Sequence, residues 1–193
     1  NRCDDSSGSV IAVFQAACRD LGDIAIAANA APAVLAEQAY RALIENEYGQ
    51  YDGLIKVLAP ALGATGLDYL KQLVLKLSQE PRQKPRDEDR KVVGWGMSGP
   101  LYADDLAERH RSSVVRLALE AIADAQGDVD AFITQQSEKA RGVPSVSVEI
   151  AQRLLAAGRA EEAWTAINAV DQDRLGWIPV EWEQTRIEVL DAL

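Results

Sequence analysis

Hydrophobic residues recur along most of the chain at spacings of three and four, and this pattern predicts α-helices rather than strands. The first stretch runs from residue 10 to residue 28, and Pro32 follows at a place suited to the first turn of a second helix. The apolar positions of the first stretch describe one face of a helix: Val10, Val13, Phe14, Ala17, Leu21, Ile24 and Ala28.

Residues 1–79 are expected to form two pairs of helices. A side-chain oxygen just before a helix can accept a hydrogen bond from a free backbone N–H of the first turn. Three residues suit this role, each ahead of a different apolar stretch: Ser9, Asp52 and Thr65.

The helical pattern stops at residues 80–101. Prolines at 81 and 85, a run of charges and then several glycines coincide there. A long connection without internal structure is uncommon inside a compact domain, so this segment is predicted to be a domain linker or a functional loop. The expected organisation is N-terminal hairpins in 1–79, the linker or loop in 80–101, and further hairpins in 102–193, with one continuous domain as the alternative.

Periodicity resumes at Tyr102 and gives a helix of about six turns, followed by shorter helices. The most informative turn lies at Gly158, because a small residue, Ala163, follows five positions later and lets two antiparallel helices approach closely. A shift of 32 residues also superimposes Ile122 on Leu154 and Phe132 on Trp164. Both features resemble tetratricopeptide repeats. The predicted class is therefore all-α, with stacked antiparallel hairpins that are tetratricopeptide-like (an α-solenoid) in the C-terminal half.

Composition limits the classes of partner and the cellular location that we expect for the protein. No apolar run approaches the roughly 20 residues that cross a bilayer, and a net charge of −10 disfavours binding to nucleic acid. The basic cluster at Arg82, Lys84 and Arg86 is followed by three acidic residues, and we interpret it as a solvated linker. With two cysteines, of which Cys18 has the surroundings of a small buried residue, a reducing, cytoplasmic location is expected.

The start of the chain and the pairing of its two cysteines each raise a question. The chain begins at Asn1 without methionine, so we expect a fragment or a processed form. A single bond between Cys3 and Cys18 remains an alternative to two free thiols.

One motif matches a nucleotide-binding fingerprint on paper. Gly94, Gly96 and Gly99 fit the pattern G-x-G-x-x-G, but that fingerprint needs a strand before it and a helix after it in a βαβ unit. The surrounding pattern lacks this unit, so we expect a flexible turn with Trp95 packed onto the adjacent helices. The lone His110 is interpreted as a boundary residue hydrogen-bonded to a neighbour.

We assign no catalytic, cofactor-binding or metal-binding residues, and we expect no cofactor. Asp104 and Glu108 share a helix face, but acidic residues are common in an exposed first turn. The candidate surface is therefore an interaction surface. In the turn at 48–53 the tyrosines either form a recognition surface or fill the gap between hairpins, and we favour the second. The candidates are Tyr48, Tyr51, Asp52, Trp95, Tyr102 and Asp104.

Four stretches look familiar as a set: NEYGQYDGLI at 46–55, YADD at 102–105, AQGDVD at 125–130 and RLLAAGR at 153–159. Together they resemble a bacterial family of unknown function, which implies a mostly helical fold with a tetratricopeptide-like C-terminal half. Members usually carry a further N-terminal helical segment. The C-terminal half is also similar to the helical region of some proteins with a SWIM-type zinc finger, without the finger itself. The resemblance implies no activity and no catalytic residues.

The leading functional hypothesis is a non-enzymatic helical-repeat module that binds another protein or a peptide. Two alternatives stay open. One is an enzyme or small-ligand binder with a cleft near residues 94–105. The other is an accessory factor of a nucleic-acid-processing system that binds through Arg82, Lys84 and Arg86.

Overall fold

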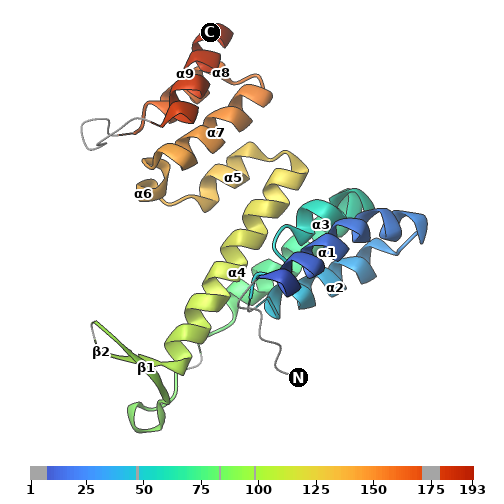
Figure 1. Cartoon of the computed structure of the whole chain (residues 1–193), viewed down its shortest axis with the longest axis vertical. Helices are drawn as coiled ribbons and strands as arrows, with labels where there is room; N and C mark the ends of the chain where they lie inside the picture. The colour runs from blue at the N-terminus through green and yellow to red at the C-terminus, as the bar shows by residue number, and fades with distance from the viewer. Residues whose placement is uncertain (1–7, 47, 83, 98, 171–178) are drawn as a thin grey trace. The chain divides into compact units, whose positions relative to one another are not determined.

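The computed structural model describes residues 8–46, 48–82, 84–97, 99–170 and 179–193. Most of them are helical, so the predicted all-α class is confirmed (Figure 1). The elements are α1 (Ser9–Ala27), α2 (Pro32–Ile44), α3 (Leu54–Gln79), β1 (Val92–Gly96), β2 (Gly99–Tyr102), α4 (Ala103–Gln126), α5 (Val129–Gln135), α6 (Glu138–Arg141), α7 (Pro144–Ala156), α8 (Ala160–Ile167) and α9 (Val180–Ala192).

The chain divides into two compact units, residues 1–126 and 127–193. This division differs from the expected one, because α4 belongs to the first unit rather than to the C-terminal hairpins. The reason lies in the stripe of α4, where Ala118 and Ile122 are buried in the same core as α3. The segment 80–101 therefore lies inside the first unit and does not connect two domains.

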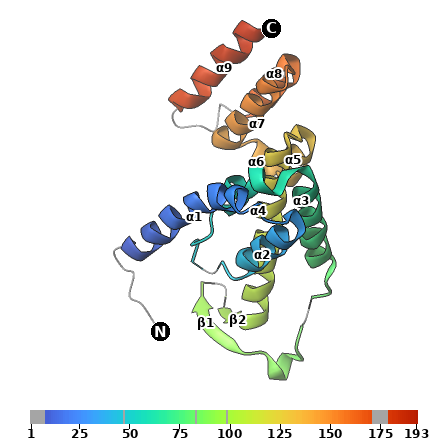
Figure 2. The ribbon, with the colours of Figure 1, turned by 90° about the vertical axis from the view of Figure 1, so that its right-hand side faces the viewer.

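Helix α3 is the centre of the first unit and packs against α1, α2 and α4 (Figure 2). Its backbone leaves helical geometry at Gly63 (φ 56°), three residues after Pro60, so the two helices expected here form one broken element. The buried core of the unit is Ala25, Leu35, Ala36, Ala39, Leu54, Ile55, Leu58, Leu62, Leu67, Leu70, Val74, Ala118 and Ile122.

Pro32 opens α2 as predicted, but the three predicted N-caps are wrong. The N-cap residues of α1 and α3 are glycines with positive φ, Gly8 and Gly53. Asp52 instead accepts a hydrogen bond from Asn46 Nδ2 at 2.8 Å. The break at Gly63 comes two residues before Thr65, which leaves Thr65 inside the helix.

Helix α1 faces α3 with its smaller residues. Cys18, Gly22 and Ala25 are buried, and the prediction that Cys18 is buried is confirmed. A Cβ atom at Gly22 would lie 2.4 Å from the carbonyl oxygen of Val57, so the two backbones are in close contact there. The larger apolar residues of α1 lie on its exposed side, although the apolar face of an amphipathic helix ordinarily packs into the core.

The second unit contains the predicted hairpin of α7 and α8. Gly158 adopts φ 73°, and the N–H groups of Gly158 and Arg159 donate to the carbonyls of Leu155 and Leu154, which closes the end of α7. Ala163 is fully buried, as close approach of the two helices requires. The tetratricopeptide likeness stays a prediction, and the division after Gln126 falls inside the first copy of the 32-residue echo.

Helix α9 packs against both helices of this hairpin. Trp182 is fully buried and donates from Nε1 to the carbonyl of Ile167 at 3.0 Å, which ties α9 to the end of α8. The core of the second unit is Phe132, Val148, Ile150, Ala151, Leu154, Ala163, Ile167, Val170, Trp182 and Val189.

Replacing Gly22 with alanine tests the close approach of α1 to α3. Helix propensity alone would make Gly22→Ala stabilising by about 1 kcal/mol. Because the new Cβ would meet the Val57 carbonyl, we expect instead a loss of about 1–3 kcal/mol in the free energy of unfolding, measured with urea. In the control Gly94→Ala the Cβ would meet only Leu101, at 3.8 Å, and the change should stay within about 0.5 kcal/mol. A stabilised Gly22→Ala protein would contradict the packing described here.

Candidate functional site

The segment at 80–101 contains an antiparallel hairpin of β1 and β2. Gly94 pairs with Leu101, Trp95 with Pro100 and Gly96 with Gly99. The segment predicted to be a domain linker or a functional loop thus contains two short paired strands. Figure 1 shows the hairpin projecting from the N-terminal end of α4, away from α1, α2 and α3.

The glycines of the G-x-G-x-x-G match have a structural role in this hairpin. Gly94 and Gly96 lie in β1, and Gly99 begins β2. Cβ atoms at Gly94 and Gly96 would lie 3.8 and 3.6 Å from the side chain of Leu101, which is ordinary van der Waals contact across the strand. Trp95 is 79% exposed, and the prediction that it packs onto the adjacent helices is wrong.

Arg90, just before β1, holds the base of the hairpin against α4. Its Nε donates to Asp104 Oδ1 at 3.1 Å and its Nη2 to Asp104 Oδ2 at 2.9 Å, which is a bidentate pair. Nη2 also lies 2.9 Å from Asp105 Oδ2. The side chains of Arg90 and Asp104 are only 12% and 7% exposed, so water competes poorly for these bonds.

The same arginine stacks on an aromatic ring of β2. Its guanidinium carbon lies 3.7 Å from the centre of the Tyr102 ring, a cation–π contact. The backbone adds a further link, because the N–H of Ala103 donates to the carbonyl of Lys91 at 2.9 Å. We call Arg90, Tyr102, Asp104 and Asp105 the arginine clamp.

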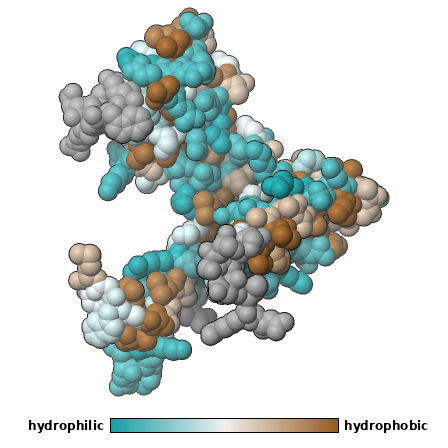
Figure 3. Space-filling model, in the orientation of Figure 1, coloured by the Kyte–Doolittle hydropathy of each residue, from teal (hydrophilic) through white to brown (hydrophobic). Residues whose placement is uncertain are grey.

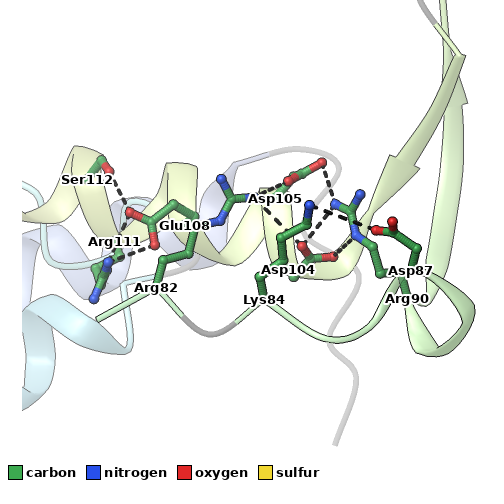
Figure 4. Close-up of polar contacts among 9 residues, drawn as sticks. All are labelled: Arg82, Lys84, Asp87, Arg90, Asp104, Asp105, Glu108, Arg111 and Ser112. Carbon is green, nitrogen blue, oxygen red and sulfur yellow. Dashed lines mark hydrogen bonds and ion pairs between the residues drawn. The ribbon is translucent and has the colours of Figure 1, made fainter. Parts of the chain in front are cut away.

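Further bonds fasten the segment ahead of the hairpin along α4 (Figure 4). Arg82 forms an ion pair with Asp105 and lies 3.7 Å from Asp104. Arg111 donates to the carbonyl of Glu80 at 2.6 Å, and the carboxylate of Glu108 accepts two bonds from Arg111 at 2.8 and 3.0 Å. Part of the basic run is thus engaged in ion pairs rather than being a freely solvated linker.

The charges of the clamp reinforce each other. The hydrogen bond from Arg90 holds the pKa of Asp104 below its usual value, and the bond to Asp104 raises the pKa of Arg90. Both carboxylates also lie in the first turn of α4, where the helix dipole favours negative charge. A carboxylate with a lowered pKa and occupied oxygens is a weak proton acceptor, so the position of Asp104 suits support rather than acid–base chemistry.

The other three candidates lie in the turn before α3. The side chain of Asn46 accepts from the N–H of Tyr51 at 2.9 Å and donates to Asp52, and Gln50 donates to the carbonyl of Glu45 at 2.9 Å. Tyr51 is half-buried and meets Phe14 of α1 edge to face, with 6.4 Å between ring centres.

Tyr48, from the same turn, is exposed. Among the described residues, no hydrogen bond or ion pair links this turn to the arginine clamp. The structure therefore distributes the six candidates over two places. Arg90 joins Tyr102 and Asp104 in the clamp, and Asn46 joins Tyr51 and Asp52 in the turn before α3.

The model of a family described as a family of unknown function (DUF6880) matches residues 1–193. The chain belongs to this family. No curated protein and no solved structure matches the chain.

The family assignment agrees with the resemblance seen in the sequence, and it brings no activity with it. No helix among the described residues has the length and apolar character needed to cross a membrane. In the same part of the chain, no cluster of three or more His, Cys, Asp or Glu residues is arranged to hold a metal ion.

Sequence reasoning missed Arg90, the residue on which the clamp depends. It lies in a charge run that reads as solvated, and its partners follow only after the hairpin. The sequence feature that could have indicated the clamp is the presence of arginines ahead of a helix whose first turn carries two aspartates. His110 agrees with its interpretation as a boundary residue, because its Nε2 lies 3.4 Å from the carbonyl oxygen of Ile44.

The lowered pKa of Asp104 predicts how stability depends on pH. The unfolded carboxyl group titrates near 3.9, and the folded one titrates lower. The contribution of Asp104 is therefore complete at neutral pH and is lost as the pH falls below about 4 toward the folded pKa. We expect Asp104→Asn to lower the urea midpoint clearly at pH 7, with a smaller difference from the unmodified protein at pH 3.5.

Asp87→Asn is the control for this experiment, since Asp87 is highly exposed and pairs with the exposed Lys84 at 3.8 Å. It should leave the urea midpoint almost unchanged at both pH values. An Asp104→Asn protein with the same loss at both pH values would show that the charge of Asp104 is not what stabilises the clamp.

Proposed function

We propose that this chain is a non-enzymatic protein-interaction module whose docking element is the β1–β2 hairpin. The observation that carries the proposal is the apolar character of the projecting part. Trp95 is 79% exposed, and Val93 and Met97, two residues before and after it, are exposed as well. In Figure 3 the hairpin carries pale and brown residues.

Exposed apolar residues of this size favour contact with another protein. Tryptophan is among the residues that most often dominate binding energy at interfaces, because it buries a large area at small cost in side-chain entropy. Single exposed apolar residues are ordinary on protein surfaces, but a group gathered at the end of a projecting element is a typical interaction site.

The arginine clamp supports the same function. A two-stranded hairpin on its own is only marginally stable in water. Here Arg90 joins the strand end to α4 through Asp104 and Tyr102, which holds the base of the hairpin in one position. A partner then binds an element that is already ordered, and the entropy lost on binding is smaller.

The charged groups near the hairpin argue against the two alternatives. Asp104 and Asp105 are already engaged by arginines, which leaves them poorly suited to an enzymatic site. Arg82 is ion-paired, and Asp87 and Glu88 lie 3.8 and 4.0 Å from Lys84 and Arg86, so negative charge beside these basic side chains opposes the approach of a phosphate backbone.

The proposal is tested with the full chain as bait for affinity capture from the native lysate, followed by calorimetry with the recovered partner. Trp95→Ser should weaken binding by about 30-fold, the effect of losing one dominant interface residue. Val180→Ser is the control, because Val180 is equally exposed but lies on α9 of the second unit. Recovery of the bait alone, or a partner that binds the Trp95→Ser chain equally well, would contradict the proposal.

A second variant tests the contribution of the clamp. Arg90→Lys keeps the positive charge but loses both the bidentate geometry and the planar stacking on Tyr102. We expect faster hydrogen exchange at the backbone amides of β1 and β2, with exchange in α7 and α8 unchanged. Unchanged exchange in the hairpin would show that Arg90 does not order it.

A further inference from the structure

Strand β1 is the outer strand of the hairpin. Strand β2 leads directly into α4 and packs against it, and all four residues of β2 are half-buried. In β1 only Gly94 is half-buried, while Val92, Val93 and Trp95 are 45%, 47% and 79% exposed. Within the described part of the chain, no backbone–backbone hydrogen bond joins Val92–Gly96 to an element other than β2. One edge of β1 is therefore free.

Pro100 determines which backbone groups of β1 point toward that edge. Opposite residues in an antiparallel pair alternate between those that exchange two backbone hydrogen bonds and those that exchange none. Trp95 lies opposite Pro100, which has no N–H to donate, so this pair is of the second kind. Gly94 and Gly96, on either side, belong to pairs of the first kind and point toward β2. The N–H and the C=O of Trp95 therefore point away from β2, toward the free edge.

The two edges of the hairpin differ in what they offer to a further strand. In the middle of β2 the outward groups belong to Pro100, which offers a carbonyl but no N–H. Proline in an edge strand is one of the features that prevent other strands from adding to it. Strand β1 has no proline, and the glycines on both sides of Trp95 carry no side chain that would hinder a second backbone. The edge of β1 is thus the one that can accept a strand.

We propose that the partner binds through an extended segment, which adds to the edge of β1 as a third strand. This inference rests on the proposed function of the hairpin and names the kind of segment that the hairpin recognises. An extended segment has free N–H and C=O groups along its edge, and these complement the two outward groups of Trp95. The backbone groups of a helix are bonded within the helix, so a helix would leave those of Trp95 without partners where water is excluded.

The side chains of β1 define what the segment should carry. Neighbouring residues of a strand point to opposite faces of the sheet, so Trp95 lies on one face and Gly94 and Gly96 on the other. A residue opposite Trp95 places its side chain beside the indole ring, where an apolar side chain is favoured. The residues on either side of it lie next to the glycines, which a large side chain of a neighbouring strand can cover. We therefore expect an apolar residue flanked by two large ones.

The bulge limits the length of the pairing. The register of β1 is irregular between Val92 and Gly94, so the regular part of the edge is centred on Trp95. The outward backbone groups of Trp95 thus provide two hydrogen bonds, and the contact with its indole ring adds to them. Both contributions come from the same residue, which makes Trp95 the centre of the proposed site.

A display library of linear random peptides, selected on the full chain, provides the probe. We expect it to yield peptides with the pattern described above, and Trp95→Ser should weaken their binding by about 30-fold or more. The control Val180→Ser, an equally exposed position on α9, should leave their binding unchanged. In nuclear magnetic resonance experiments the bound peptide should slow hydrogen exchange of the Trp95 amide by about tenfold or more, because this N–H gains a hydrogen bond. Exchange in α7 and α8 should not change.

Methylation of single backbone amides of the selected peptide tests the pairing itself. A methyl group on the amide that bonds to the Trp95 carbonyl should weaken binding by about tenfold or more, because the hydrogen bond is lost. The amides that alternate with it point away from β1, and their methylation should have little effect.

Three results would overturn the third-strand pairing: a methylation scan without this alternation, an unchanged exchange rate of the Trp95 amide, or a library without binding peptides. These results differ from a failure of the proposed function. In that case the captured partner would bind the Trp95→Ser chain as well as the unmodified one, or capture would recover the bait alone.

Discussion

The bidentate bond between Arg90 and Asp104 determines the path of the chain from α3 to α4. Taking an arginine and an aspartate largely out of water is unfavourable, and the pair persists only where good geometry and additional bonds offset that penalty. Here the additional bonds come from Asp105, which shares the same guanidinium, and from the Tyr102 ring beneath it. The hairpin, the start of α4 and the segment ahead of the hairpin all take their positions from this group of contacts.

Periodicity predicted the longer helices, and α3 and α7 bury several residues at helical spacing. It did not predict the four-residue helix α6, in which no residue is buried. It also predicted the α7–α8 hairpin, where a glycine with positive φ and a buried alanine perform the expected roles. It did not predict the strands. Gly94 and Gly96 remove the alternation of polar and apolar residues on which strand prediction relies.

The orientation of α1 shows a different limit of sequence patterns. Its apolar stripe is clear in the sequence, yet the buried side is the one that contains Gly22. Which side of a helix packs inward depends on how closely two backbones can approach, and the contact of Gly22 with Val57 is visible only in three dimensions.

The candidate site was found in part for a related reason. Tyr102 and Asp104 could be chosen from the local sequence. The role of Arg90 could not, because its contact with Asp104 exists only once the hairpin has formed.

The arginine clamp holds the base of the hairpin, and the residues beyond the base are not needed for that contact. Arg90, Tyr102 and Asp104 secure the fold at the base of the hairpin, so the residues beyond the base contribute little to the core. Lengthening a loop at such a position adds only a slowly growing entropic penalty. Sequence change can therefore accumulate at the end of the hairpin without loss of folding. The same property makes the hairpin end a suitable position for grafting a foreign peptide.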